Sequence, residues 1–160
     1  MNKHPHLIPL IITASSVFVL DQLTKWWLLE VFHIAQRSPV SLHENFALVM
    51  AWNKGVSFSM FSHSAAWMPY VLSAVAVMIS AVLVRLCLKS PHRWERMGYA
   101  MVVGGALGNV VDRLRFGAVA DFFYAHIGDL GWPAFNIADS AICIGVGVLL
   151  ISMVKHPARP

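Results

Sequence analysis

Four long apolar segments organise the chain, and its polar residues gather between them. The segments cover roughly residues 8–29, 67–88, 97–114 and 134–154. Each is close to the roughly 20 residues that a helix needs to cross a bilayer. The pattern predicts a membrane α-helical fold with four transmembrane helices in one domain, residues 1–160. In the third segment, Gly104 and Gly108 form a G-x-x-x-G pattern, which favours close packing between helices.

The region between the first two segments has a different pattern. From roughly residue 31 to residue 64, the long apolar run breaks into shorter stretches that alternate or are rich in β-forming residues. Asn53, Lys54 and Gly55 form a turn signal between two such stretches. We therefore expect a small β-hairpin or cradle that rests on the membrane surface. Asn53 itself has two open interpretations, as a turn residue or as a contact for a substrate.

Composition strengthens the membrane interpretation. The chain is 58% hydrophobic and 12% charged, with a mean hydropathy of +0.63, whereas soluble domains carry about 25% charged residues. The net charge of +4 is compatible with nucleic-acid binding, but the basic residues cluster beside the apolar segments instead of forming a basic face. We expect no nucleic-acid partner.

The distribution of Lys and Arg predicts the orientation in the membrane. Four spans put both termini on one side. That side carries seven Lys and Arg residues, namely Lys3, Arg85, Lys89, Arg93, Arg96, Lys155 and Arg159. The other side carries four, namely Arg37, Lys54, Arg113 and Arg115. Because cytoplasmic loops are enriched in Lys and Arg, both termini should be cytoplasmic, and the β-rich region should face the periplasm or the cell exterior.

Two carboxylates stand out as candidates for catalysis. Asp121 lies between AVA and FFY, and Asp139 lies about five residues into the last apolar segment. Carboxylates in apolar surroundings are costly unless they are paired, protonated or functional. The predicted topology brings both residues to the same membrane depth, at the outer face. A pair of close carboxyls shares one proton, so one can act as a base and the other as an acid.

The remaining charged residues of the spans and loops have structural interpretations. Asp112 is followed by Arg113 and is interpreted as part of an ion pair or a helix-end device. Asp129 lies in the polar turn GDLG and should be solvated. Asp21 and Lys25 are spaced i, i+4 and share one helix face. Either they form a local ion pair that lessens the cost of burial, or they face the bundle interior and brace the active-site end.

Other reaction classes lack their motifs. No H-E-x-x-H zinc motif, P-loop or dinucleotide-binding glycine pattern is present, and we expect no metal or cofactor. The GVSFS stretch lacks the second glycine of a serine nucleophile elbow, which leaves a Lys54–Ser57 dyad as a minor alternative. The carboxylates remain. In an aspartic-peptidase scheme, the pair activates a water and protonates the scissile carbonyl. Asn136 is spaced to orient a carboxylate, and Asn109 and Arg113 to support it.

Five segments, in order, resemble a known family. They are DQLTK from Asp21, WNKGVSFSMF from Trp52, GGALGNVVDR from Gly104, VADF from Val119 and PAFNIADS from Pro133. Together they resemble the bacterial prolipoprotein signal peptidases, or signal peptidase II, over nearly the whole chain. The resemblance implies an aspartic endopeptidase of the bacterial inner membrane. It would cleave the signal peptide from a precursor just before a cysteine that carries diacylglyceryl.

The resemblance also implies residue roles and partners. Asp121 and Asp139 match the catalytic pair. The positions that match residues shaping or supporting the site are Asp21, Lys25, Asn53, Gly55, Gly108, Asn109, Arg113 and Asn136. The implied partners are lipidated prolipoproteins, membrane lipids and the cyclic peptide antibiotic globomycin, and we expect a monomer.

Three alternatives belong to other classes. Intramembrane Asp and Lys residues are also typical of an ion path in a small transporter or channel component. The glycine-rich third segment would suit a non-catalytic membrane scaffold. A presenilin-type aspartic protease would need G-x-G-D, whereas AVAD precedes and includes Asp121 here.

Overall fold

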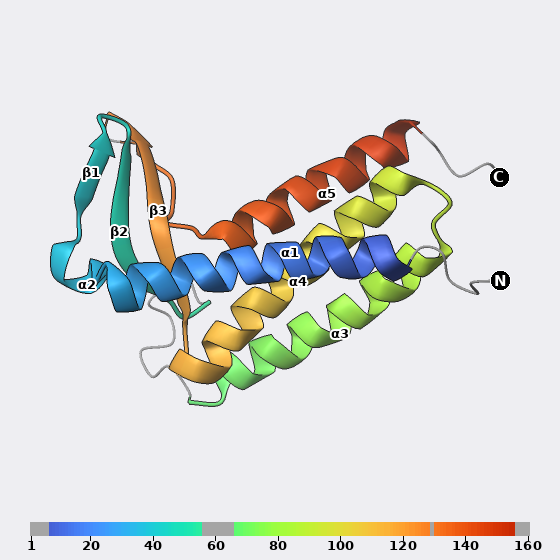
Figure 1. Ribbon diagram of the computed structural model, residues 1–160, viewed down its shortest axis with the longest axis horizontal. Coiled ribbons are helices and arrows are strands. Elements are labelled where there is room, and N and C mark those ends of the chain that lie inside the picture. Colours follow the sequence, from blue (N-terminus) through green and yellow to red (C-terminus); the bar gives the residue numbers. More distant parts are fainter. Residues whose placement is uncertain (1–6, 56–65, 129, 156–160) are drawn as a thin grey trace.

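Four long helices form a bundle, and a small sheet stands at one end of it (Figure 1). The structure is a computed structural model that describes residues 7–55, 66–128 and 130–155. The long helices are α1 (Leu7–Trp26), α3 (Met68–Lys89), α4 (Arg93–Phe116) and α5 (Ile137–Lys155). A π-helical turn, η1 (Trp27–Val31), extends α1, and the short helix α2 (Ile34–Arg37) follows it. Both termini lie at the end of the bundle away from the sheet (Figure 1).

The helix predictions are confirmed, with small shifts at the ends. The last helix begins at Ile137, three residues after the predicted boundary, because Pro133 to Asn136 form the extended lead-in to it. Within the described residues, three helical segments are long and apolar enough to cross a membrane: Leu7–Val31, Met68–Lys89 and Ile137–Lys155. The third predicted span is a helix, α4, but it is not among them. Three of the four predicted membrane spans are therefore confirmed as candidate spans.

The position of α4 explains its composition. It packs against α1, α3 and α5, so its neighbours shield most of its surface. A helix in that place needs small residues more than large apolar ones, because small residues let backbones approach closely. A Cβ on Gly104 would lie 2.5 Å from the Ala14 carbonyl oxygen, and one on Gly105 would lie 2.5 Å from that of Ala138. The glycines thus set the spacing of α4 to α1 and α5.

The sheet is antiparallel and has the order β1-β2-β3-β4. Its strands are β1 (Val40–His43), β2 (Phe46–Asn53), β3 (Val119–Ile127) and β4 (Leu130–Gly131). Leu28, Ile34, Leu48, Ala120 and Phe122 form a buried cluster that joins η1 and α2 to the sheet. This cluster fixes β3 against the end of the first helix.

The predicted β-rich region contains a hairpin, but its turn is not at Asn53 to Gly55, and the stretch that follows this triplet lies outside the described residues. The turn between β1 and β2 lies at Glu44 and Asn45, and β2 then pairs with β3, which comes from much later in the chain. Asn53 is the last residue of β2. Its Oδ1 accepts a hydrogen bond of 2.8 Å from the Gly55 N–H, and Gly55 has a φ of 78°, so the predicted turn at this triplet is confirmed. Ser57, the rest of the predicted region to residue 64, and Asp129 lie outside the described residues.

We predict that Gly104→Ala lowers the thermal unfolding midpoint in detergent. The added methyl would force α1 and α4 apart, and overpacking of this kind costs about 1–3 kcal/mol. Gly147→Ala in α5 is the matched control, because a Cβ there would have no neighbour within 4 Å. Equal midpoints for the two variants would contradict the close contact between α1 and α4.

Candidate active site

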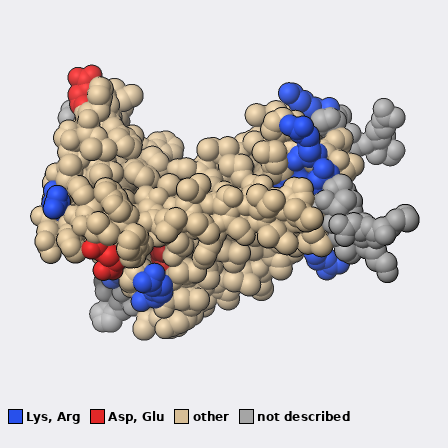
Figure 2. All heavy atoms as spheres, in the orientation of Figure 1, with Lys and Arg blue, Asp and Glu red and all other residues tan. Residues whose placement is uncertain are grey.

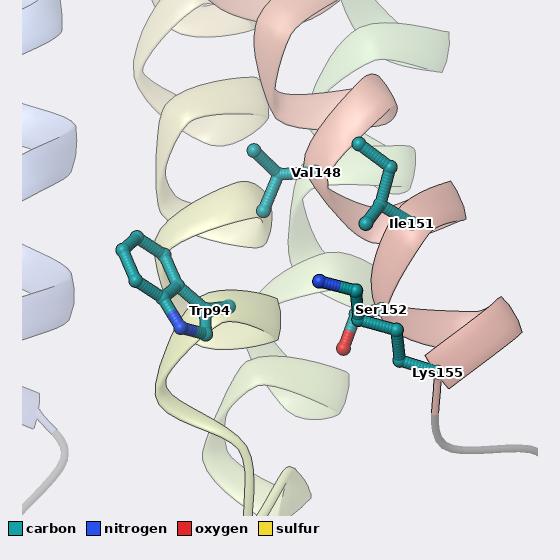
Figure 3. Close-up of a pocket in the computed structure, with 5 residues that line it drawn as sticks. All are labelled: Trp94, Val148, Ile151, Ser152 and Lys155. Atoms are coloured by element: carbon teal, nitrogen blue, oxygen red, sulfur yellow. The ribbon is translucent and has the colours of Figure 1, made fainter.

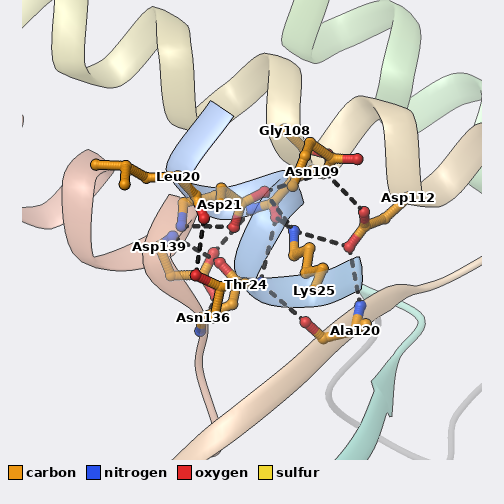
Figure 4. Close-up of polar contacts among 12 residues, drawn as sticks. Leu20, Asp21, Thr24, Lys25, Gly108, Asn109, Asp112, Ala120, Asn136 and Asp139 are labelled. Atoms are coloured by element: carbon orange, nitrogen blue, oxygen red, sulfur yellow. Dashed lines mark hydrogen bonds and ion pairs between the residues drawn. The ribbon is translucent and has the colours of Figure 1, made fainter. Parts of the chain in front are cut away.

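A buried lysine holds two carboxylates where the bundle meets the sheet (Figure 4). The Lys25 Nζ lies 2.8 Å from Asp21 Oδ2 on its own helix and 2.8 Å from Asp112 Oδ2 on α4. All three side chains are almost fully buried. The prediction that Asp21 and Lys25 pair is confirmed, and so is the alternative that they face the bundle interior. The two interpretations describe one arrangement.

The structural interpretation of Asp112 is confirmed, but its ion-pair partner was predicted wrongly. Asp112 pairs with Lys25 of α1 and not with its sequence neighbour Arg113. Its carboxylate also accepts hydrogen bonds from Gln22 Nε2, at 3.1 Å, and from the Ala120 N–H, at 3.1 Å. Residues adjacent along a helix do not face each other, which is why the neighbouring arginine is not the partner.

The same network reaches the residue before each candidate catalytic aspartate. Asp112 accepts the N–H of Ala120, which precedes Asp121 in β3. Asp21 accepts the N–H of Ala138 at 3.0 Å, which precedes Asp139 in the first turn of α5. The carboxylates held by Lys25 therefore fix the backbone beside both candidates.

Gln22 is a member of this network that the sequence analysis missed. Its Nε2 donates to Asp21 at 3.1 Å, to the Gly108 carbonyl at 3.2 Å and to Asp112. The signal was available, because an amide in an apolar span needs a partner. Gly108 allows the approach: a Cβ there would lie 2.5 Å from Asp21 Oδ2.

Asn136 links the two candidate catalytic aspartates. Its Nδ2 donates to Asp121 Oδ1 at 2.7 Å, and its N–H donates to Asp139 Oδ2 at 3.3 Å. In return, the Asp139 N–H donates to Asn136 Oδ1 at 2.9 Å. This reciprocal pair is a capping box, with Asn136 as the N-cap and Asp139 three residues later. The start of α5 therefore fixes the Asp139 carboxylate in place.

Asn109 connects the carboxylates that Lys25 holds to the two candidate catalytic aspartates. Its Nδ2 donates to Asp139 Oδ1 at 2.8 Å, while its Oδ1 accepts from Lys25 Nζ and from Asn136 Nδ2, each at 3.3 Å. The predicted site residues Asp21, Lys25, Asn109 and Asn136 thus lie in one hydrogen-bonded cluster with Asp139 (Figure 4).

The sheet brings Asn53, Gly55 and Arg113 to the same place. Asn53 lies opposite Val119 across the β2–β3 pair, and its side chain hydrogen bonds to Asp121. A Cβ on Gly55 would come within 4.0 Å of an Arg113 Nη atom. The Arg113 guanidinium is close enough to Asp139, Asp112 and Asp121 to attract them, yet its buried Nε has no hydrogen-bond partner among the described residues.

The surroundings of Asp121 raise its pKa to about 6, from an ordinary value of 3.8. Burial is the largest cause, because it disfavours the charged carboxylate, and the nearby charge of Asp139 adds to it. Hydrogen bonds from Asn53 and Asn136 and the charge of Lys25 oppose the shift. Asp121 is 1% exposed, whereas Asp139 is partly exposed. The two carboxyls therefore differ in their access to water.

The described residues contain no group of three or more His, Cys, Asp or Glu side chains that could hold a metal ion. What the arrangement offers chemically is a pair of carboxyls, one of them able to bind a proton near neutral pH. A cationic lysine and an arginine lie beside this pair.

Comparisons with known proteins identify relatives of this chain. A lipoprotein signal peptidase of Azoarcus sp. (strain BH72) is 42% identical over 96% of this chain and 92% of its own length. Another, from Neisseria meningitidis serogroup C, is 38% identical over 91% of this chain and 88% of its own. Two solved structures of bacterial membrane enzymes superpose with TM-scores of 0.81 and 0.80. The first is 26% identical and covers 97% of this chain and 98% of its own length. The second is 24% identical and covers 100% of this chain and 99% of its own length.

The fold and these relatives define a multi-pass membrane protein of the aspartic peptidase class. The family model for signal peptidase (SPase) II matches residues 13–155. The chain belongs to the signal peptidase II family.

We predict that Lys25→Met destabilises the fold by about 3–5 kcal/mol, because it leaves Asp21 and Asp112 buried without their cation. The measurement is unfolding in mixed detergent micelles. Lys54→Met, at an exposed lysine beside the site, should change stability little. A similar loss for both variants would mean that the buried ion pairs are not the cause.

We predict a pH step in stability from Asp121. A carboxyl whose pKa is raised on folding stabilises the folded state most below its unfolded value, and that contribution is lost as the pH rises through about 6. Asp121→Asn should therefore gain stability relative to the natural protein between pH of about 4 and 6. In an Asp139→Asn background, the midpoint of the step should move to lower pH, because one cause of the shift is removed. If the difference in stability between Asp121→Asn and the natural protein stayed constant across this pH range, the raised pKa would be contradicted.

Proposed function

We propose that Asp121 and Asp139 are the catalytic pair with which this signal peptidase II removes signal peptides from prolipoproteins. The observation that carries the proposal is the bridge by Asn136, which hydrogen bonds to both carboxyls. The raised pKa of Asp121 supports it, because a shared proton requires one carboxyl that binds a proton near neutral pH. No other pair of carboxyls in the described residues has both a common hydrogen-bond donor and no ion pair with Lys25.

The pair performs acid–base catalysis on a peptide bond. One carboxylate removes a proton from a water molecule, and the water attacks the scissile carbonyl carbon. The protonated carboxyl donates to the carbonyl oxygen, and the proton on the first carboxyl then passes to the departing amine. Because the two carboxyls share one proton in this scheme, the roles of base and acid belong to the pair and not to either aspartate alone.

The neighbouring residues orient this pair. Asn109 and Asn136 hold the Asp139 carboxylate, and Asn53 and Asn136 hold Asp121. The positive charge of the Arg113 guanidinium lies near both aspartates, where it would stabilise the developing oxyanion. Asp139 is the more exposed of the two aspartates, so substrate and water reach it first. Gly55 lets the Leu72 side chain pack closely beside this site, because a Cβ on Gly55 would lie 2.5 Å from Leu72 Cδ1.

The substrate we propose is a precursor with an apolar signal helix and a diacylglyceryl-modified cysteine, cleaved just before that cysteine. A helix with acyl chains partitions into lipid, so it reaches the enzyme laterally. The large apolar side chains on the outer faces of α1, α3 and α5 are mostly exposed, which suits lipid contact. The site lies where one end of the helix bundle meets the sheet (Figures 1 and 4). We propose that this end lies at the depth of the lipid headgroups. We expect globomycin to compete for this position.

We further propose that α4 is the fourth span of a single domain in the bacterial inner membrane. Its 24 residues span about 36 Å, more than the roughly 30 Å of a hydrocarbon core. Four spans with cytoplasmic termini agree with the excess of Lys and Arg at the end that carries the termini (Figure 2). The sheet and the aspartates are then periplasmic. The proposed mechanism needs no cofactor and no second copy of the chain.

We predict that Asp121→Asn and Asp139→Asn each reduce cleavage of a diacylglyceryl-modified precursor by at least about 10²–10⁴-fold, the range that acid–base catalysis supplies. The assay uses purified protein in detergent and follows release of the signal peptide. Glu44→Gln, at an exposed carboxylate in the β1–β2 turn, is the matched control and should retain full activity.

Two results would contradict this assignment. Full activity in either aspartate variant would exclude the proposed pair, provided that the thermal unfolding midpoint shows a folded protein. Cleavage of an unlipidated precursor at the same rate as the lipidated one would exclude the diacylglyceryl group as part of what the enzyme recognises.

A further inference from the structure

A pocket lies between the first turn of α4 and the last turns of α5, at the end of these helices away from the aspartates. Figure 3 shows the residues that line it. It has a volume of about 170 Å³ and lies between α4 and α5. Trp94 of α4 forms one wall. Four residues of α5 form the other, namely Val148, Ile151, Ser152 and Lys155. Its size is similar to the roughly 150 Å³ of an apolar cavity that binds benzene, so it can take a segment of a hydrocarbon chain.

The packing of the two helices explains why this pocket exists. Gly98 and Gly145 bring α4 and α5 into close contact, because a Cβ on Gly98 would lie 2.9 Å from the Gly145 carbonyl oxygen. One turn nearer the helix ends, Trp94 and Val148 replace these small residues. The larger side chains hold the helices apart, and the pocket opens between them.

The rim of the pocket is basic. Lys155 lines it and is exposed at the last residue of α5. The Arg93 guanidinium lies 4.6 Å from the centroid of the Trp94 ring, so a second cation rests on the pocket wall. The acidic residue nearby in sequence, Glu95, accepts hydrogen bonds from Ser90 at 2.5 Å and Ser152 at 3.1 Å. Lys and Arg gather at this end of the molecule (Figure 2).

The pocket is also at the depth of a lipid headgroup. Trp94 and Asp112 are 18 residues apart on α4, which is about 27 Å along the axis. Because a hydrocarbon core is roughly 30 Å thick, the pocket and the aspartates lie near opposite faces of the bilayer. Around the pocket, Ile151, Met153 and Val154 are 58–82% exposed, as expected for side chains in contact with acyl chains. A tryptophan at this depth is typical of a membrane interface.

We propose that this pocket binds an anionic glycerophospholipid of the bilayer. One acyl chain occupies the space between Trp94, Val148 and Ile151, and the phosphate lies against Lys155 and Arg93. The charge of the rim favours an anionic headgroup over a zwitterionic one, and the apolar walls favour a lipid over a free phosphate ion. The site is separate from the aspartates, so a bound lipid would support the α4–α5 contact without entering the peptidase site.

The first test compares two lipids with the same acyl chains, phosphatidylglycerol and phosphatidylcholine, by native mass spectrometry of the purified protein. We expect phosphatidylglycerol to be retained more strongly. The double variant Arg93→Gln/Lys155→Gln should weaken its binding by roughly 25-fold, since each surface cation contributes about fivefold. The matched control is Arg85→Gln/Lys89→Gln, which removes two cations of α3 from the same end and should leave binding unchanged. All variants should keep their cleavage activity, so this test is independent of the proposed catalytic pair.

The second test locates the acyl chain. Trp94 is the tryptophan of this end, and the other five lie on the sheet side, namely Trp26, Trp27, Trp52, Trp67 and Trp132. Brominated phosphatidylglycerol at low occupancy should quench a fluorescence component that Trp94→Phe removes. Equal binding of the two lipids, or equal effects of the two double variants, overturns the proposal. Competition by inorganic phosphate alone would indicate a simple anion site, and a dimer that Trp94→Ala dissociates would indicate a second copy of the chain as the occupant.

Discussion

The buried ion pairs of Lys25 are the interaction on which the rest of the site depends. One ammonium holds Asp21 and Asp112, and backbone N–H groups complete the coordination of both carboxylates. Those N–H groups belong to Ala120 and Ala138, each immediately before a proposed catalytic aspartate. The network of Lys25 on α1 thereby fixes the positions of β3 and of the start of α5 relative to each other. Buried charges are expensive, and they are retained here because they set a geometry that apolar packing alone would leave adjustable.

This arrangement divides the acidic residues into two kinds. Asp21 and Asp112 have a cation and several donors, so their function is to hold the structure. Asp121 and Asp139 have amide donors instead, chiefly from Asn109 and Asn136. An amide orients a carboxylate without adding an opposite charge, whereas the Lys25 ammonium pairs with the charges of Asp21 and Asp112 at 2.8 Å. A carboxyl that must gain and lose a proton during each reaction cycle therefore needs amide donors and no ion pair. Burial raises the pKa of Asp121, which favours proton binding near neutral pH.

The helices could be predicted from the sequence, and the two aspartates could be singled out as candidates, but the contacts of the network could not be predicted. Runs such as residues 67–88 are apolar around the whole helix, so length alone identifies them, and a carboxylate in such surroundings calls for a reason. Strand β3 was missed because Asp121 interrupts its apolar residues and because its pairing partner lies about 70 residues earlier. Adjacent sequence suggested Arg113 as the partner of Asp112. The actual partner, Lys25, is 87 positions away, and only the packing of α1 on α4 brings them together.

The central helix shows why hydropathy is an incomplete guide to such a protein. α4 has many charged residues near its ends and small ones along its middle, since three other helices surround it. Gly98, Gly104 and Gly105 allow contact with α5 and α1, and Gly108 makes room for the Asp21 carboxylate. These close contacts along α4 also determine how its two ends lie relative to the neighbouring helices. Near the C-terminal end of α4, these contacts bring α1 close enough for Lys25 to reach Asp112. Near its N-terminal end, Trp94 precedes Gly98 by one turn, and there α4 and α5 separate and the pocket opens. The packing along one helix thus determines the geometry of both the proposed peptidase site and the proposed lipid site.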